Sequence, residues 1–102
     1  MTNSLLSGLR PTHPGELLRE DVLPALGRAK TEIADLLRVS RQTLYDILSE
    51  KKPVTPSMAL RIAKLTGTTP ESWVNMQRNF DLRVEADRAA DILDQIPTLE
   101  PA

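Results

Sequence analysis

Residues 30–49, KTEIADLLRVSRQTLYDILS, contain two short helical patterns joined by a tight connection. The first pattern covers residues 31–37. The second covers residues 40–49, where Ser40 is placed to cap the first turn through its hydroxyl. In the second pattern the apolar residues recur at the spacing of one helix face, and they are Leu44, Ile47 and Leu48. Two helices connected in this way have the layout of a helix-turn-helix.

The outward side of the second pattern is polar and rich in hydrogen-bonding groups. Glutamine can pair with adenine, arginine with guanine, and aspartate can accept from cytosine N4 in the major groove. The predicted base-reading residues are Ser40, Arg41, Gln42, Thr43, Tyr45 and Asp46. The predicted phosphate contacts before and after this helix are Lys30, Thr31, Lys51 and Lys52. The pattern therefore predicts binding to double-stranded DNA; the alternative is the solvated outer face of a small helical bundle.

The charge distribution favours the first of these readings. The whole chain has a net charge of −1, yet residues 28–64 hold eight Lys and Arg against four Asp and Glu, a local excess of +4. Residues 65–102 hold three basic against seven acidic residues, a local net charge of −4. A basic middle and an acidic end predict two surfaces, one for phosphate and one for another partner.

Helix signals without strand signals predict an all-α fold of about five helices in one domain. Residues 13–16, HPGE, open the first helix, which Pro24 ends or kinks. The second helix buries Ile33, Ala34, Leu36 and Leu37. Thr55 and Thr69 each cap a later helix that begins with proline, and Gly67 separates the two. We expect a flexible arm over 1–12, a DNA-binding domain over 13–80 and a helical extension over 81–102.

The last helix has two apolar stripes and could run as far as Ile96. The first stripe, which packs most simply on the core, is Trp73, Met76 and Phe80. The second stripe lies beyond the bundle, and we expect it to form a homodimer interface through Leu82, Ala86, Ala89, Leu93 and Ile96. The alternative is a helix that breaks near Asp81 and folds back.

Several functional classes are not expected. The chain has no cysteine, and its single histidine, His13, is more simply explained as helping to cap or pack a helix start than as a catalytic group or ligand. We predict no catalytic residues, no metal site, no cofactor and no enzyme activity. No stretch is suited to a signal peptide or membrane span, so a cytoplasmic protein is expected.

Three segments resemble one known family. Residues 13–16 (HPGE), residues 39–73 (VSRQTLYDILSEKKPVTPSMALRIAKLTGTTPESW) and residues 75–87 (NMQRNFDLRVEAD) resemble HigA-type antitoxins, also called VapI or plasmid-maintenance antidotes, within the Xre/Cro-like helix-turn-helix family. The resemblance implies a five-helix bundle like that of lambda repressor, with an extended C-terminal helix. It also implies an antitoxin that neutralises a HigB/RelE-like ribonuclease toxin and, as a dimer, represses its own operon by binding operator DNA.

Carried over by position, the resemblance places Ser40, Arg41, Gln42, Thr43 and Asp46 toward the groove. Two positions depart from the common pattern: Lys30 stands where glutamine is frequent, and Arg38 stands where glycine is frequent. If Arg38 adopts the left-handed conformation, the strain costs about 1 kcal/mol. The remaining alternatives are a stand-alone repressor without a toxin and a protein-interaction module that does not bind DNA.

Overall fold

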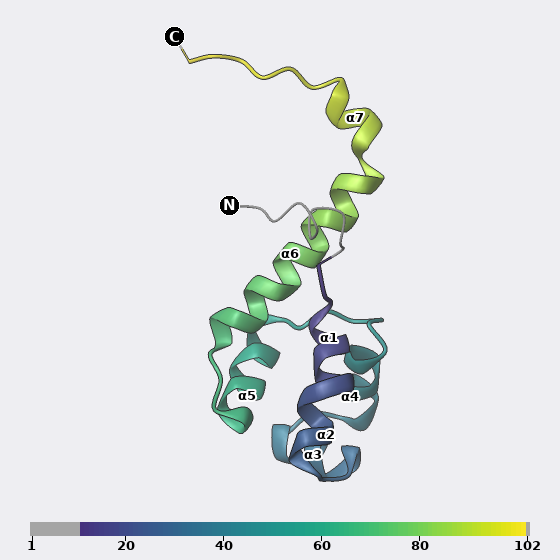
Figure 1. Cartoon of the computed structure of the whole chain (residues 1–102), viewed down its shortest axis with the longest axis vertical. Coiled ribbons are helices and arrows are strands. Elements are labelled where there is room, and N and C mark those ends of the chain that lie inside the picture. The colour runs from purple at the N-terminus through teal and green to yellow at the C-terminus, as the bar shows by residue number, and fades with distance from the viewer. Residues whose placement is uncertain (1–10, 102) are drawn as a thin grey trace.

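The computed structural model describes residues 11–101, in which all regular elements are helices and there is no strand (Figure 1). Its elements are α1 (Pro14–Leu17), the π-helical turn η1 (Leu18–Val22), α2 (Leu23–Leu26), α3 (Lys30–Leu37), α4 (Arg41–Leu48), α5 (Pro56–Thr66), α6 (Pro70–Arg88) and α7 (Ala90–Asp94). The predicted all-α fold is confirmed. Because α1, η1 and α2 are continuous, the five predicted helices are present and α7 is a sixth. The arm expected over 1–12 lies, apart from Pro11 and Thr12, outside the described residues.

Pro24 does not end the first helical segment. The preceding turn, η1, widens so that the Leu23 N–H donates to the Leu18 carbonyl, five residues back. Proline lacks an N–H and its ring crowds the carbonyl four residues earlier, and the single π-helical turn makes room for this interruption without ending the helix. The segment then continues to Leu26 and ends on Gly27, whose φ of 66° is left-handed, a usual helix-ending conformation for glycine.

The core lies between the first segment, α3, α4, α5 and the start of α6. Its fully buried members include Ile33, Leu44, Ile47 and Ile62. Leu36, which was predicted to be buried, is 49% exposed, so that prediction is wrong. The inward face of α3 is formed by Ile33, Ala34 and Leu37, and Leu36 lies about 110° away from the centre of that face at 100° per residue.

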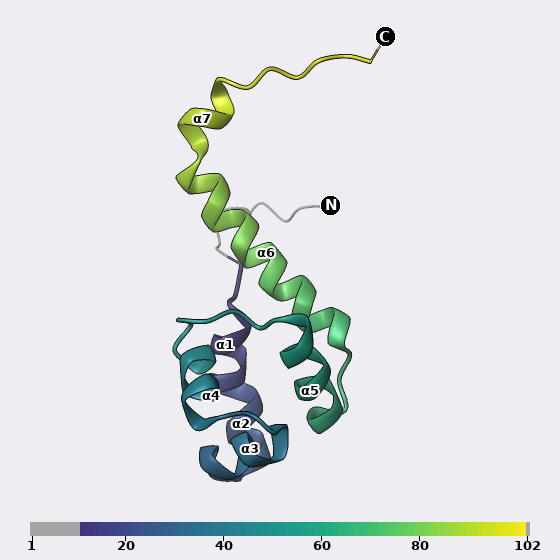
Figure 2. The same cartoon turned by 180° about the vertical axis from the view of Figure 1, so that it is seen from behind.

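The C-terminal helix α6 leaves the bundle and carries α7 away from it, as both views show (Figures 1 and 2). Trp73 is buried and Phe80 half-buried, so the first apolar stripe packs on the bundle. The helix runs unbroken past Asp81 and ends at Arg88, so it neither folds back there nor reaches Ile96. Nothing in the local sequence stops a helix at Ala89, because alanine is the strongest helix former.

The molecule is elongated, 54 × 28 × 24 Å. In the described part of the chain, no helix is both long and apolar enough to cross a membrane.

Candidate nucleic-acid interface

The turn between α3 and α4 is closed by Arg38 in the left-handed conformation, with φ 61° and ψ 42°. The Arg38 N–H donates to the Asp35 carbonyl and the Val39 N–H to the Ala34 carbonyl, both at 3.1 Å. This is the Schellman arrangement, in which glycine is usual, and a non-glycine residue there costs about 1 kcal/mol. Arg38, which stands where related sequences frequently have glycine, is therefore a strained residue at the centre of the helix-turn-helix.

A distant arginine supports the strained turn. The Arg61 guanidinium, on α5, donates to the Leu37 carbonyl at 2.8 Å and to the Arg38 carbonyl at 3.2 Å. These carbonyls are at the C-terminal end of α3, where a cation is favourable. Sequence reasoning missed this role, because no local pattern connects residues 23 or 24 positions apart.

Ser40 caps α4 as predicted. Its Oγ accepts from the Thr43 N–H at 3.0 Å and donates to the Thr43 Oγ1 at 2.8 Å. The hydroxyl of Ser40 is thus already engaged within the helix. The first turn of α4 is held in place before any ligand arrives.

The apolar inner face of α4 is the one predicted. Leu44, Ile47 and Leu48 are at most 4% exposed. On the other side Arg41 and Gln42 are exposed, Tyr45 is 40% exposed and Thr43 is half-buried. The helix is ordered, its inner face is apolar, and its outer face carries an exposed arginine and an exposed glutamine. Such a surface can enter a major groove.

Asp46 is held by two neighbours instead of pointing freely outward. The Gln42 Nε2 donates to its Oδ1 at 2.8 Å, and the Lys52 Nζ lies 3.4 Å from its Oδ2. The Asp46 side chain is only 15% exposed, whereas that of Lys52 is 55% exposed. The lysine reduces the repulsion that a carboxylate would exert on phosphate. The aspartate fixes one N–H of the Gln42 amide, so its oxygen and second N–H remain available for a base.

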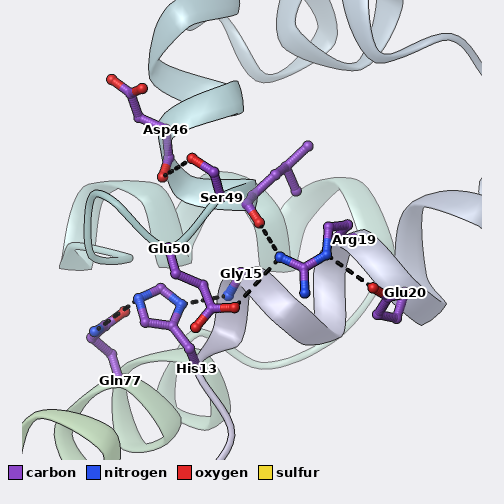
Figure 3. A network of polar contacts seen from close by, with 9 residues as sticks. His13, Gly15, Arg19, Glu20, Asp46, Ser49, Glu50 and Gln77 are labelled. Atoms are coloured by element: carbon purple, nitrogen blue, oxygen red, sulfur yellow. Dashed lines mark hydrogen bonds and ion pairs between the residues drawn. The ribbon is translucent and has the colours of Figure 1, made fainter. Parts of the chain in front are cut away.

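The C-terminal end of α4 is fixed by Arg19 from η1 (Figure 3). Its guanidinium donates to the Leu48 carbonyl at 2.6 Å and lies 3.4 Å from a Glu50 carboxylate oxygen and 2.9 Å from one of Glu20. Glu50 has a φ of 65°, the second left-handed non-glycine residue in the described chain. Sequence reasoning missed both Arg19 and Glu50.

The HPGE segment positions α4 from its other side. His13 caps α1, its Nδ1 accepting from the Gly15 N–H at 2.9 Å, as the sequence predicted for this end. At Gly15 a Cβ would lie 1.9 Å from the Ile47 carbonyl oxygen, so only glycine permits this approach of α1 to α4. A glycine inside a first helical turn, where it is unfavourable, was the available sequence signal.

His13 also joins α1 to α6. Its ring is edge-on to Phe80 with centroids 4.8 Å apart, and its Nε2 lies 3.5 Å from the amide nitrogen of Gln77. Gln77 is itself buried and accepts from the Val54 N–H at 2.8 Å. Burial lowers the pKa of His13 below 6.5, against the opposing effect of Glu50 and Asp81.

The predicted phosphate contacts occupy two places. Lys30 and Thr31 form the start of α3, with Lys30 exposed and Thr31 half-buried. Lys51 and Lys52 follow α4, where their N–H groups donate to the Asp46 carbonyl at 2.8 and 3.1 Å. Of these four residues, Lys52 is the one whose side chain lies against Asp46, the partner of Gln42.

Residues 18–73 match the helix-turn-helix family. Virulence-associated protein I of Dichelobacter nodosus is 38% identical over 72 residues, which are 71% of this chain and 67% of that protein. The structure of antitoxin GraA in complex with its operator is 37% identical, with a TM-score of 0.83 over 99% of each chain. Pseudomonas aeruginosa antitoxin HigA with the higBA promoter is 29% identical, with a TM-score of 0.80 over 90% of this chain and 98% of that one. The chain belongs to the helix-turn-helix family, in the group of HigA-type antitoxins and related plasmid-maintenance antidote proteins.

Proposed function

We propose that this protein is a bacterial antitoxin that binds the operator of its own operon and neutralises a HigB/RelE-like ribonuclease toxin. The observation that carries the DNA-binding half is the outer face of α4. Arg41 and Gln42 are exposed at the start of a capped helix, and Arg19 and Arg61 fix the backbone at its end and at the turn before it. The related GraA and HigA structures that contain operator or promoter DNA support this half.

In this proposal Arg41 and Gln42 read base edges, and Ser40, Thr43 and Tyr45 surround them. Asp46 orients Gln42. Lys30, Thr31, Lys51 and Lys52 contact phosphate, with Lys52 shared between Asp46 and the DNA. Base contacts give specificity, whereas phosphate contacts give affinity and salt dependence.

The test is an electrophoretic shift with the DNA upstream of the chain's own gene. We expect Arg41→Ala with Gln42→Ala to lose sequence-specific binding while the circular dichroism spectrum stays that of the parent. The matched control is Arg78→Ala with Asn79→Ala, a basic and amide pair on α6 that is likewise exposed. A parent protein without a salt-sensitive, specific shift on this DNA would refute repression of that promoter.

Toxin neutralisation has a separate test. A basic ribonuclease would be attracted to acidic surface residues, and the candidates are the C-terminal segment and the exposed Glu16, Glu20 and Asp21. Glu20 already forms an ion pair with Arg19, so it is a weaker candidate for contact with the toxin than Glu16 or Asp21. We expect the chain to co-purify with the product of an adjoining reading frame for a small basic protein and to suppress its RNA cleavage. If no such partner exists and the operator is still bound, the protein is a stand-alone repressor.

Dimerisation is the third element of the proposal. Leu82, Leu93 and Ile96 are 62%, 50% and 60% exposed, and Ala86 is exposed and Ala89 half-buried on the same extension. An apolar stripe of this kind is expected to pack against a second copy. Two copies present two recognition helices about 34 Å apart, one turn of DNA. Sedimentation equilibrium at micromolar concentration tests this element, and a strict monomer would refute it.

A further inference from the structure

A shallow apolar groove lies between α3 and α5, on a part of the chain that the proposed operator contacts do not use. Its volume is about 480 Å³; its apolar surface includes Leu36, Leu60 and Leu65, and Arg38, Arg61 and Lys64 supply its charged groups. Leu36 is 49% and Leu60 61% exposed. Two further hollows, toward Gly67 and toward Val74, also include Leu60. The groove and both hollows therefore share Leu60. A surface with several exposed leucines in and around such hollows is typical of one that another segment covers.

The C-terminal segment of the chain has the complementary character. Within residues 90–101 the large exposed apolar side chains are Ile92, Leu93, Ile96 and Leu99, at 59%, 50%, 60% and 83%. The charged residues of this segment are Asp91, Asp94 and Glu100, and it has no lysine or arginine. An apolar segment with three negative charges thus matches an apolar groove with three positive charges.

The segment does not reach the groove of its own chain. The helix α6 is continuous over 19 residues, a length of about 28 Å. It begins next to α5 and carries α7 to the opposite end of the molecule (Figures 1 and 2). The segment is therefore presented to a second molecule, and a pair of molecules can exchange their segments reciprocally about a two-fold axis.

We propose that the groove formed by Leu36, Leu60, Leu65, Arg38, Arg61 and Lys64 binds residues 90–101 of a second copy of this chain. The inference rests on the dimer of the proposed function and names the surface that receives Leu93 and Ile96. The apolar side chains fill the groove, while Asp91 and Asp94 approach Lys64 and its basic neighbours. The stripe nearer the bundle, Leu82 and Ala86, then packs where the two α6 helices meet.

Disulfide trapping tests the pairing directly, because the natural chain has no cysteine. Leu60→Cys and Ile96→Cys each replace a side chain that is at least 60% exposed, so neither change removes a core contact. The two variants are mixed in equal amounts, allowed to exchange subunits and oxidised mildly. We expect the Leu60→Cys to Ile96→Cys heterodimer to form at least tenfold faster than any product of Asp21→Cys, an exposed control on η1.

The other products overturn the inference in distinguishable ways. Preferential linkage of Leu60→Cys to itself would mean that the groove is covered by its own symmetry mate. Preferential linkage of Ile96→Cys to itself would mean that the C-terminal segments pair with each other. Linkage no faster than the control would mean that neither surface contacts a second copy.

A charge-reversal pair provides a second readout on the full chain. We expect Lys64→Glu alone and Asp94→Lys alone each to weaken dimerisation roughly two- to fivefold in sedimentation equilibrium, and the double variant to regain most of it. Additive losses in the double variant would contradict the pairing. If the parent chain is dimeric and binds its operator while both tests fail, only the groove assignment is wrong; a monomeric parent refutes the dimer as well.

Discussion

Gly15→Ala tests whether the close approach of α1 to α4 holds the recognition helix in place. The added Cβ would lie 1.9 Å from the Ile47 carbonyl oxygen, whereas ordinary contact begins near 3.4 Å. The two helices must therefore separate by about 1.5 Å, or the backbone must distort by a similar amount. Overpacking of this kind costs about 1–3 kcal/mol, against which alanine gains up to about 1 kcal/mol of helix propensity.

We therefore expect Gly15→Ala to lower the free energy of unfolding by about 1–2 kcal/mol, near the upper end because a helical carbonyl cannot rotate away. For a domain of this size the melting temperature should fall by roughly 4–16 °C. Urea unfolding followed by circular dichroism and by the fluorescence of buried Trp73 measures the change. Operator affinity of the folded fraction should also fall, because α4 is displaced.

Gly67 supplies the matched control, because it has a φ of 70° and a Cβ there would meet no atom within 4 Å. Gly67→Ala should cost about 1 kcal/mol from backbone strain alone, and Gly67→Asn less, since asparagine tolerates the left-handed region. At Gly15 the order reverses, with asparagine worse than alanine. A Gly15→Ala variant within about 0.5 kcal/mol of the parent would refute the reasoning from the helix contact.

Three further predictions concern the same interface. Burial lowers the pKa of His13 below 6.5, so as the pH falls the unfolded chain binds a proton before the folded chain does. The stability that neutral His13 contributes is therefore complete above about pH 6.5 and is lost as the pH falls through the folded pKa. His13→Asn keeps a capping acceptor and should flatten urea midpoints between about pH 5 and 7. Asp46→Ala should reduce the ratio of operator to random-DNA affinity roughly tenfold in competition shifts, whereas Asp46→Asn, which still accepts from Gln42, should retain most of it. Arg61→Met keeps the aliphatic stem but removes two hydrogen bonds to the α3 terminus, so urea unfolding should show a loss of about 1 kcal/mol; no loss would mean that the turn needs no support.

Much of the interface follows from signals that act within a few residues. The Ser40 cap, the helix starts at Pro56 and Pro70, the end of α5 at Gly67 and the inward face of α4 all appear where the sequence predicted them. Each depends on hydrogen bonds or spacings within one helical turn, which the local sequence controls. The pairing of Gln42 with Asp46 is of the same kind, four residues apart on one helix.

Two predictions from the sequence, the burial of Leu36 and the length of the last helix, differ from the structure. The sequence predicts Leu36 among the buried residues of α3, yet the orientation of α3 on the bundle turns it outward. The last helix was expected to be able to reach Ile96, and it ends at Arg88 although alanines follow. Both differences arise because burial and helix length depend on what packs against a segment, and composition does not specify that.

Local sequence therefore accounts for the all-α class, the helix boundaries near the turn and the apolar and polar faces of α4. How that helix is held depends on the packing of distant segments: Arg19 and Arg61 bind backbone carbonyls, Gly15 lies against Ile47, and Lys52 lies beside Asp46. The reason is physical. Caps and faces are set by neighbours along one helix, whereas a guanidinium that meets a carbonyl 24 or 29 residues away depends on how whole helices pack.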